Sequence, residues 1–197
     1  MTNVAVIYSS ATGNVYQLAE AIAEGAASAG AETRLRRVVE LSSQEMIARN
    51  PKWVAHRQAT AHIPEAAIED LEWADAFVFG SPTRFGNVTA SLKHFIDQAG
   101  ILWGQGKLTD KAVSAFTSAS TTHGGVESTL LALYNTFYSW GCIIVPPGYA
   151  DPVLRQTGNP YGASFIARKG ATISDDELAA ARFQGRRTAE IAARLAP

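Results

Sequence analysis

A short run of hydroxyl and amide side chains follows the first apolar stretch of the chain and has the chemistry of a phosphate-binding loop. The segment Val4–Val15, VAVIYSSATGNV, passes from apolar residues into polar ones around a single glycine: Ser9, Ser10, Thr12, Gly13 and Asn14. A helix follows at once, and the free N–H groups of its first turn point to the same spot. Because neutral donors and the helix dipole compensate phosphate charge, this site needs no lysine. The spacing matches neither the G-x-G-x-x-G fingerprint nor the P-loop, and an ordinary capped helix start is the other interpretation of this segment alone.

Two further loops share this composition and also follow apolar runs. Ser81–Asn87, SPTRFGN, comes directly after Ala76–Gly80, and Ser118–Gly125, SASTTHGG, comes directly after Ala112–Thr117. Like Ser9–Asn14, neither loop contains Asp or Glu. In an open parallel sheet, ligands bind outside the carboxyl ends of the strands. We therefore expect the three loops to form one site for a phosphorylated, planar, hydrogen-bonding ligand.

Strand and helix patterns alternate along the chain and would position these loops. Continuous apolar runs predict strands buried on both faces at Val4–Tyr8, Ala76–Gly80, Ala112–Thr117 and Cys142–Val145, and the alternating segment Glu32–Val38 predicts an edge strand. Helical periodicity covers Val15–Ala29, Val88–Gln98, Val126–Trp140 and a last helix that opens with a capping box at Ser174 and runs to about Leu195. This alternation predicts a doubly wound α/β sandwich.

Length and interruptions of the pattern predict one domain with two insertions. The chain has 197 residues, which is the size of a single domain with a substantial core, so we expect residues 1–197 to form one domain. Two stretches fall outside the alternation, near 41–65 and near 146–172. Insertions of this length usually carry function or interfaces.

Charge and composition argue against several classes of protein. The net charge is −1 and no run of Lys and Arg occurs, so we expect no nucleic acid or membrane surface as partner. The single cysteine, Cys142, excludes an internal disulfide, and the scattered histidines lack metal-ligand spacing, so no metal site is expected. The N-terminus enters a strand without a charged leader and no long hydrophobic segment follows, which predicts a cytoplasmic protein without an integral membrane segment.

Four sequence motifs together resemble those of the WrbA-type flavodoxin-like NAD(P)H:quinone oxidoreductases, also named tryptophan-repressor-binding-protein-like. The motifs are YSSATGNV, GSPTRFGN, FTSASTTHGG and GNPYGAS, and the resemblance extends from Val4 to Leu195, with PTRFGN the most specific piece. It implies a flavodoxin-like fold, an α/β sandwich with a doubly wound five-stranded parallel sheet of order 2-1-3-4-5 and helices on both faces. It also implies non-covalent FMN, two-electron reduction of quinones to hydroquinones by NAD(P)H in a ping-pong cycle, and a homotetramer.

The resemblance assigns cofactor-binding residues to the three loops. The FMN phosphate would be held by Ser10, Ala11, Thr12, Gly13, Asn14 and Val15. One side of the isoalloxazine ring would be flanked by Pro82, Thr83, Arg84, Phe85 and Gly86. The other side of the ring and the ribityl chain would contact Ser118, Ala119, Ser120, Thr121, Thr122, His123 and Gly124.

Three more positions enter through the resemblance. Trp103 matches the aromatic residue that lines the substrate pocket, and Thr12 stands where some members place a tyrosine near the nicotinamide cofactor. Ser139 stands where a flavin-facing histidine is expected, and a serine supplies a hydrogen bond but no imidazolium. His123 is a candidate for that missing role. We assign no protein acid or base, because N5 of the flavin carries the hydride.

Arg84 is the only fixed cation in the three loops, and we expect it to stabilise the reduced, anionic flavin. Pairing of Arg84 with a carboxylate at a subunit contact is the alternative. Two other functions stay open at this point: a flavodoxin-type FMN electron-transfer protein that does not itself oxidise NAD(P)H, and a flavin-free α/β protein that acts as an assembly or regulatory partner. The near-neutral charge and the 146–172 insertion disfavour the electron carrier, because such carriers usually present an acidic docking face.

Overall fold

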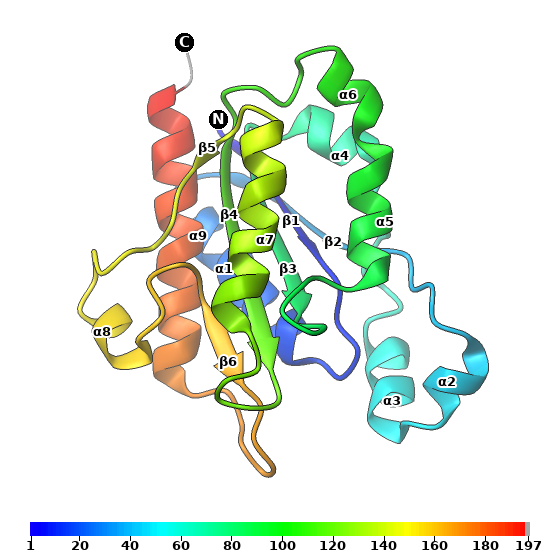
Figure 1. Cartoon of the computed structure of the whole chain (residues 1–197). Coiled ribbons are helices and arrows are strands. Elements are labelled where there is room, and N and C mark those ends of the chain that lie inside the picture. Colours follow the sequence, from blue (N-terminus) through cyan, green and yellow to red (C-terminus); the bar gives the residue numbers. More distant parts are fainter. Residues whose placement is uncertain (196–197) are drawn as a thin grey trace.

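A parallel β-sheet forms the centre of the molecule (Figure 1). The computed structural model describes residues 1–195. Its main strands pair in the order β2-β1-β3-β4-β5, and every pair of neighbours is parallel. Their bounds are β1 Asn3–Tyr8, β2 Glu32–Arg37, β3 Ala76–Pro82, β4 Ala112–Ala119 and β5 Ile143–Ile144. The predicted strand order, and β2 as an edge strand, are confirmed.

The fifth strand position is shared by two short strands. β5 pairs with the start of β4, with Ala112 opposite Ile143, and β6 (Ser164–Ile166) pairs with its end, with Thr117 opposite Ser164. The chain between β5 and β6 loops out of the sheet. The sequence predicted a four-residue strand at Cys142–Val145 and no sixth strand, because so short a strand is stabilised by its partner rather than by its own pattern.

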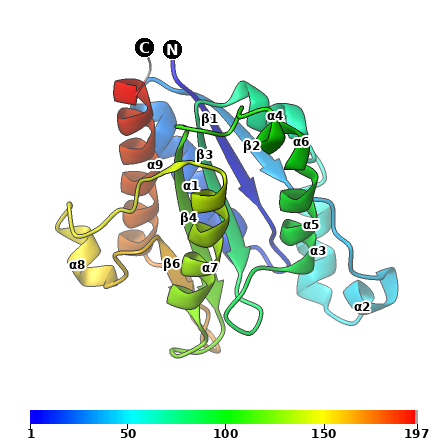
Figure 2. The ribbon, with the colours of Figure 1, turned by 45° about the horizontal axis from the view of Figure 1, so that its top comes forward.

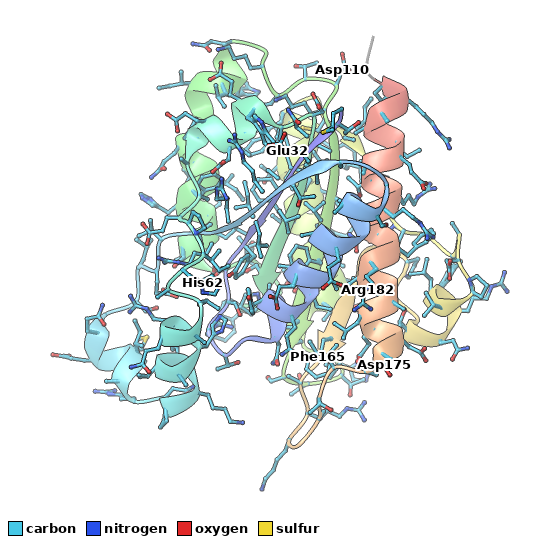
Figure 3. The ribbon with its side chains drawn as sticks, turned by 180° about the vertical axis from the view of Figure 1, so that it is seen from behind. Glu32, His62, Asp110, Phe165, Asp175 and Arg182 are labelled. Atoms are coloured by element: carbon cyan, nitrogen blue, oxygen red, sulfur yellow. The ribbon has the colours of Figure 1, made fainter. Side chains whose placement is uncertain are left out.

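Helices cover both faces of the sheet. α1 (Asn14–Ser28) and α9 (Asp175–Leu195) lie on the face that Figure 3 shows, and α5 (Ala90–Gln98), α6 (Gly100–Gly104) and α7 (Val126–Ser139) lie on the face toward the viewer in Figure 1. Alternate residues of β1 serve the two layers, since Val6 packs toward α1 and α9 while Ile7 packs toward the other helices. Among residues 1–195, no helix is long and apolar enough to span a membrane.

Two glycines bring α1 and α9 into close contact. A Cβ atom on Gly185 would lie 2.0 Å from the carbonyl oxygen of Ile22, and one on Gly25 would lie 1.9 Å from that of Arg182. Backbone therefore packs against backbone at this crossing. The predicted capping box at the start of α9 is present, because Ser174 N donates to Glu177 Oε2 (2.8 Å) and Glu177 N donates to Ser174 Oγ (3.3 Å).

The two insertions lie on opposite sides of the sheet (Figure 2). The first contains α2 (Gln44–Ala48) and α3 (Pro51–Ala59), with α4 (Ile68–Trp73) after it, and the second contains α8 (Val153–Thr157) and β6. The side chain of Asn50 caps α3 by accepting from Lys52 N at 3.1 Å, and Pro51 occupies the first helical position. The sequence did not predict α2, α3, α4, α6 or α8, although Asn50-Pro51 is a recognisable helix start.

A buried glutamine joins α9 to the interrupted fifth strand. Gln184 is fully buried; its Nε2 donates to Ser114 Oγ (2.6 Å) and Ala115 O (2.7 Å), and its Oε1 accepts from Ala163 N (2.6 Å). Ser114 Oγ in turn donates to Val145 O at 2.8 Å. The amide thus supplies hydrogen bonds between β4 and the chain just before β6, where the fifth strand is interrupted.

Candidate cofactor-binding site

The loop between β1 and α1 ends in a helix start with free N–H groups. Gly13 has φ +99°, its N–H donates to Ser10 Oγ at 3.2 Å, and α1 begins at Asn14. Within residues 1–195, no side chain caps this helix, and its first turn holds no acidic residue. Its N–H groups and positive dipole end are therefore available to an anion.

The loop after β3 is a tight turn that exposes an aromatic ring. Arg84 N donates to Asn87 O (2.7 Å) and Asn87 N donates to Arg84 O (3.1 Å), so Phe85 and Gly86 form the tip with φ +55° and +78°. A non-glycine residue at positive φ is strained, and the Phe85 side chain is fully exposed. The turn thus holds a large apolar ring in solvent, as expected of a ligand or subunit contact.

The loop after β4 is tied to this turn. Thr83 N donates to Ser118 O at 2.8 Å, and the Thr83 hydroxyl donates to Gly124 O at 3.2 Å. A Cβ atom on Gly125 would lie 2.9 Å from Gly86 Cα, so the close approach of the two loops requires glycine there. The second and third loops therefore form one rigid rim.

The three loops border one cleft of about 650 Å³ at the carboxyl ends of the strands, the lower edge of the sheet in Figure 1. The predicted site residues that line it are Ser10, Ala11, Thr12, Asn14, Val15, Pro82, Thr83, Arg84, Ser118, Ala119 and Ser120. The remaining predicted residues of these loops are not part of the lining: Gly13, Phe85, Gly86, Thr121, Thr122, His123 and Gly124. Arg84 is exposed, its Nη1 donates to Thr83 O at 3.0 Å, and no carboxylate of the described chain forms an ion pair with it.

The two insertions supply the remaining walls of the cleft, which the sequence did not assign to the site. One wall comes from α3 and its cap, through Asn50, Lys52 and Trp53. The other is the loop after β6, residues 167–172. The length of the insertions indicated that they carry function or interfaces, but it did not show which of their side chains line the cleft.

A smaller polar cavity of about 130 Å³ lies beneath α3, beside the phosphate-type loop. Tyr8 and Trp53 line it, and neither the Tyr8 hydroxyl nor Trp53 Nε1 has a hydrogen-bond partner among the described residues, although both atoms are buried. His56 also lines it, with its ring 5.5 Å from that of Tyr16, and burial lowers the pKa of His56. α3 therefore packs over buried polar groups that have no hydrogen-bond partner among residues 1–195.

Trp103 and Ser139 lie at the opposite edge of the sheet from the three loops. Trp103 is in α6 rather than in a loop, is 56% exposed, and donates from Nε1 to Ser139 O at 2.8 Å. Ser139 ends α7, which returns from the third loop to the amino ends of the strands (Figure 1). Within one chain, neither residue lines the cleft, and their expected roles beside the cofactor stay predictions. In a parallel α/β unit each helix carries its last residues away from the ligand edge.

The residues at the cleft fit FMN. The uncapped start of α1, the positive φ of Gly13 and the neighbouring hydroxyls suit a phosphate monoester. The volume lies within the range of about 300–1,000 Å³ that ligand pockets of this size occupy. The second and third loops offer main-chain groups and hydroxyls to the edge of a planar ring.

A doubly wound parallel sheet of this order, with a phosphate-type loop after its first strand, defines a flavodoxin-like protein. The model of the family "NADPH-dependent FMN reductase" matches residues 2–151. Among relatives, an "NAD(P)H dehydrogenase (quinone)" from Deinococcus radiodurans is 45% identical over 192 residues, which cover 97% of this chain and 96% of the relative. One of the same name from Syntrophobacter fumaroxidans is 46% identical and covers 98% of both chains.

Solved structures agree with these relatives. A WrbA-like flavodoxin from Agrobacterium tumefaciens superposes with a TM-score of 0.71 at 25% identity and covers 100% of both chains. A flavodoxin from the domain Archaea has a TM-score of 0.66 at 17% identity, covers 98% of this chain and 99% of its own, and supports the fold alone. The chain belongs to the WrbA-type NAD(P)H dehydrogenase (quinone) family of flavodoxin-like FMN reductases, which confirms the resemblance found in the sequence.

Proposed function

We propose that this protein is an FMN-dependent NAD(P)H:quinone oxidoreductase that reduces quinones by two electrons in a ping-pong cycle. When bound, FMN supplies the hydride chemistry, at its N5 atom. The chain acts as a single flavodoxin-like domain that binds FMN, exposes one ring face and admits the two substrates in turn. The relatives named NAD(P)H dehydrogenase (quinone), which match this chain over nearly its full length, support this activity.

The observation that carries the proposal is the uncapped start of α1 at the floor of a cleft without carboxylates. The N–H groups after Gly13, with the hydroxyls of Ser10 and Thr12, hold the phosphate. The turn at Arg84–Asn87 and the linked third loop orient the ring through main-chain groups. None of the lining residues that the structure describes is Asp or Glu, so an anionic dinucleotide meets no repulsion there.

We extend the proposal to a homotetramer in the cytoplasm. The edge of the sheet opposite the cleft carries exposed apolar side chains, with Ile101 72%, Trp103 56% and Tyr138 69% exposed. Such residues are typical of subunit interfaces. Trp103 and Ser139 lie away from the cleft of their own chain, so in this proposal a second copy brings them to the cofactor. Sedimentation of the FMN-loaded protein tests the assembly, and a monomer would contradict it.

Anaerobic rapid mixing tests the activity. The FMN-loaded protein is mixed first with NADH or NADPH and then with a benzoquinone, while the visible absorbance of the flavin is followed. We expect rapid bleaching by the nucleotide, recovery on quinone addition, and parallel double-reciprocal plots in the steady state. A flavin that neither nucleotide bleaches would favour the electron-transfer protein, and protein that retains no FMN would favour the flavin-free alternative.

Arg84 tunes the cofactor in this proposal. As an exposed guanidinium on the cleft lining without a carboxylate partner in residues 1–195, it can lie against a negative charge on the ring. Removing a contact of about 1–3 kcal/mol corresponds to about 20–60 mV for a two-electron couple. We expect Arg84→Ala to lower the midpoint potential of the bound FMN by this amount. An unchanged potential would show that Arg84 does not stabilise the reduced flavin.

A further inference from the structure

Positive charge gathers at the cleft although the whole chain is nearly neutral. Four cationic side chains line it, Lys52, Arg84, Arg168 and Lys169, and no carboxylate of the described residues shares that lining. The formal net charge of the chain is −1. The cleft therefore has a local excess of positive charge that overall composition does not explain.

FMN does not account for this excess. Its phosphate fits the neutral loop at the start of α1, and Arg84 belongs to the turn that borders the ring. Quinones carry no phosphate. Arg168 and Lys169 instead stand on the loop after β6, which projects beyond the strand ends at the bottom of Figure 1. A ligand that meets them must extend outward from the ring.

The position of Arg168 is fixed by contacts at both ends of the residue. Ala167 N donates to Ala119 O at 2.7 Å, which attaches the base of the loop to β4. The Arg168 guanidinium donates from Nη2 to Thr122 Oγ1 at 2.7 Å, so the third loop orients it. Lys169 follows on the same loop and also lines the cleft, so a guanidinium and an ammonium, both suited to phosphate, stand on this wall.

We propose that Arg168 and Lys169, with Lys52 on the opposite wall, bind the phosphates of the adenosine half of NADPH and make the protein prefer NADPH to NADH. This rests on the proposed function, since it places the nicotinamide at the flavin and the adenosine at the outer end of the cleft. The pyrophosphate carries two negative charges, and a 2′-phosphate adds about 1.5–2 more at neutral pH. The cations at the outer wall match this second group, which NADH lacks.

Steady-state kinetics of the FMN-loaded enzyme test the preference. In the double variant Arg168→Ala/Lys169→Ala we expect KM for NADPH to rise about 10- to 100-fold, because each phosphate contact is worth about one factor of ten, with a much smaller rise for NADH. kcat should change less than KM. Arg168→Lys should recover part of the loss. Arg155→Ala, which removes a cation from α8 outside the cleft, is the matched control and should leave the ratio of the two KM values unchanged.

Calorimetry without turnover separates this inference from the proposed activity. The FMN-loaded protein is titrated with adenosine 2′,5′-bisphosphate and, separately, with adenosine 5′-monophosphate. We expect at least tenfold tighter binding of the bisphosphate, lost in the double variant and weakened by added salt. If neither nucleotide is oxidised but this difference persists, the proposed function fails and the phosphate site stands. Equal binding of the two probes, or an unchanged KM ratio in the double variant, overturns the inference.

Discussion

The two insertions that wall the cleft are attached to the sheet in opposite ways. The second insertion is held by a buried hydrogen bond from Ala163 N to Gln184 Oε1 and by a partly buried one from the Tyr134 hydroxyl to Tyr161 O. In the first insertion, α3 has no buried residue and lies over the cavity in which the Tyr8 hydroxyl and Trp53 Nε1 lack partners among residues 1–195. One wall is therefore anchored to the scaffold by a buried side chain. In the other wall α3 buries no residue of its own, and the first insertion is attached through its neighbours, because Ile47 of α2 is buried and Arg37 Nε donates to Ile63 O at 2.9 Å.

This difference fits the division of work that we propose. A cation that selects between two similar dinucleotides must be held in position. Arg168 meets this condition, because its guanidinium donates to Thr122 Oγ1. A wall that admits a nicotinamide and then a quinone must move to let each substrate enter and leave. The helix α3, which buries no residue, is suited to such movement. The predictions below test the comparison, beginning with the largest expected effect.

Removing the buried amide of the second insertion should have the largest effect. Gln184→Ala leaves Ala163 N and Ala115 O without partners in a buried region and opens a cavity. At about 1–3 kcal/mol for each unsatisfied group, we expect the free energy of unfolding to fall by about 3–5 kcal/mol. Chemical denaturation of the FMN-free protein measures it. Gln58→Ala on the exposed side of α3 is the control, and equal losses in both variants would contradict the contrast between the insertions.

Strain introduced into the phosphate-type loop should lower the affinity for FMN as well as the stability of the fold. Gly13 has φ +99°, so Gly13→Ala forces an unfavourable backbone onto the residue that precedes α1. A cost of about 1–2 kcal/mol corresponds to roughly a 5- to 30-fold rise in the Kd for FMN. Fluorescence titration of FMN measures this.

A glycine in the second insertion provides the matched control for that substitution. Gly158 has φ +78° at the end of α8, and no atom of the described residues lies within 4 Å of a Cβ placed there. Gly158→Ala should therefore lower stability by a similar amount while leaving the Kd for FMN unchanged. A parallel loss of affinity in both variants would show that general destabilisation, not the loop, controls binding.

Deleting the unpartnered hydroxyl beneath α3 should change little. Tyr8 is nearly as buried as Gln184, but in the part of the chain that the structure describes its hydroxyl has no hydrogen bond to lose. We expect Tyr8→Phe to alter the free energy of unfolding by less than about 1 kcal/mol, against several for Gln184→Ala. A loss of about 3 kcal/mol in denaturation experiments would mean that the cavity holds a tightly bound partner and that the first insertion is not loosely attached.

The smallest effect concerns the pH dependence of the first insertion. Burial lowers the pKa of His56 below its value in the unfolded chain, about 6.5, so the native state favours the neutral ring. The stabilisation is present above about pH 6.5 and is lost as the pH falls through the lower native pKa. We therefore expect the FMN-free protein to lose stability from about pH 6.5 downward, and His56→Gln to lose less over the same range.

Exposed His62 on the same insertion is the control for this titration. His62→Gln should retain the pH dependence of the unmodified protein, measured as the midpoint of denaturation at several pH values. Identical pH profiles for all three proteins would exclude His56 as its origin.

Much of the fold and part of the site could be predicted from local patterns. The apolar runs that became β1, β3 and β4 were correctly placed because strands buried on both faces need continuous hydrophobic residues. The three polar loops could be found because they follow those strands directly. β6 was missed because its three residues depend on pairing with β4, and α3 was missed although Asn50-Pro51 marks its start.

The sequence by itself determined the parallel sheet, its order through the resemblance, and a neutral phosphate-type loop at the carboxyl edge, because these follow from residues that are near neighbours along the chain. Only the tertiary structure decided that Lys52 and Lys169 line one cleft, that Trp103 and Ser139 lie at the far edge, and that Gln184 joins the interrupted strand. Each of these depends on which distant segments pack together. That choice is made by burial and hydrogen bonding of the whole chain, and local spacing does not encode it.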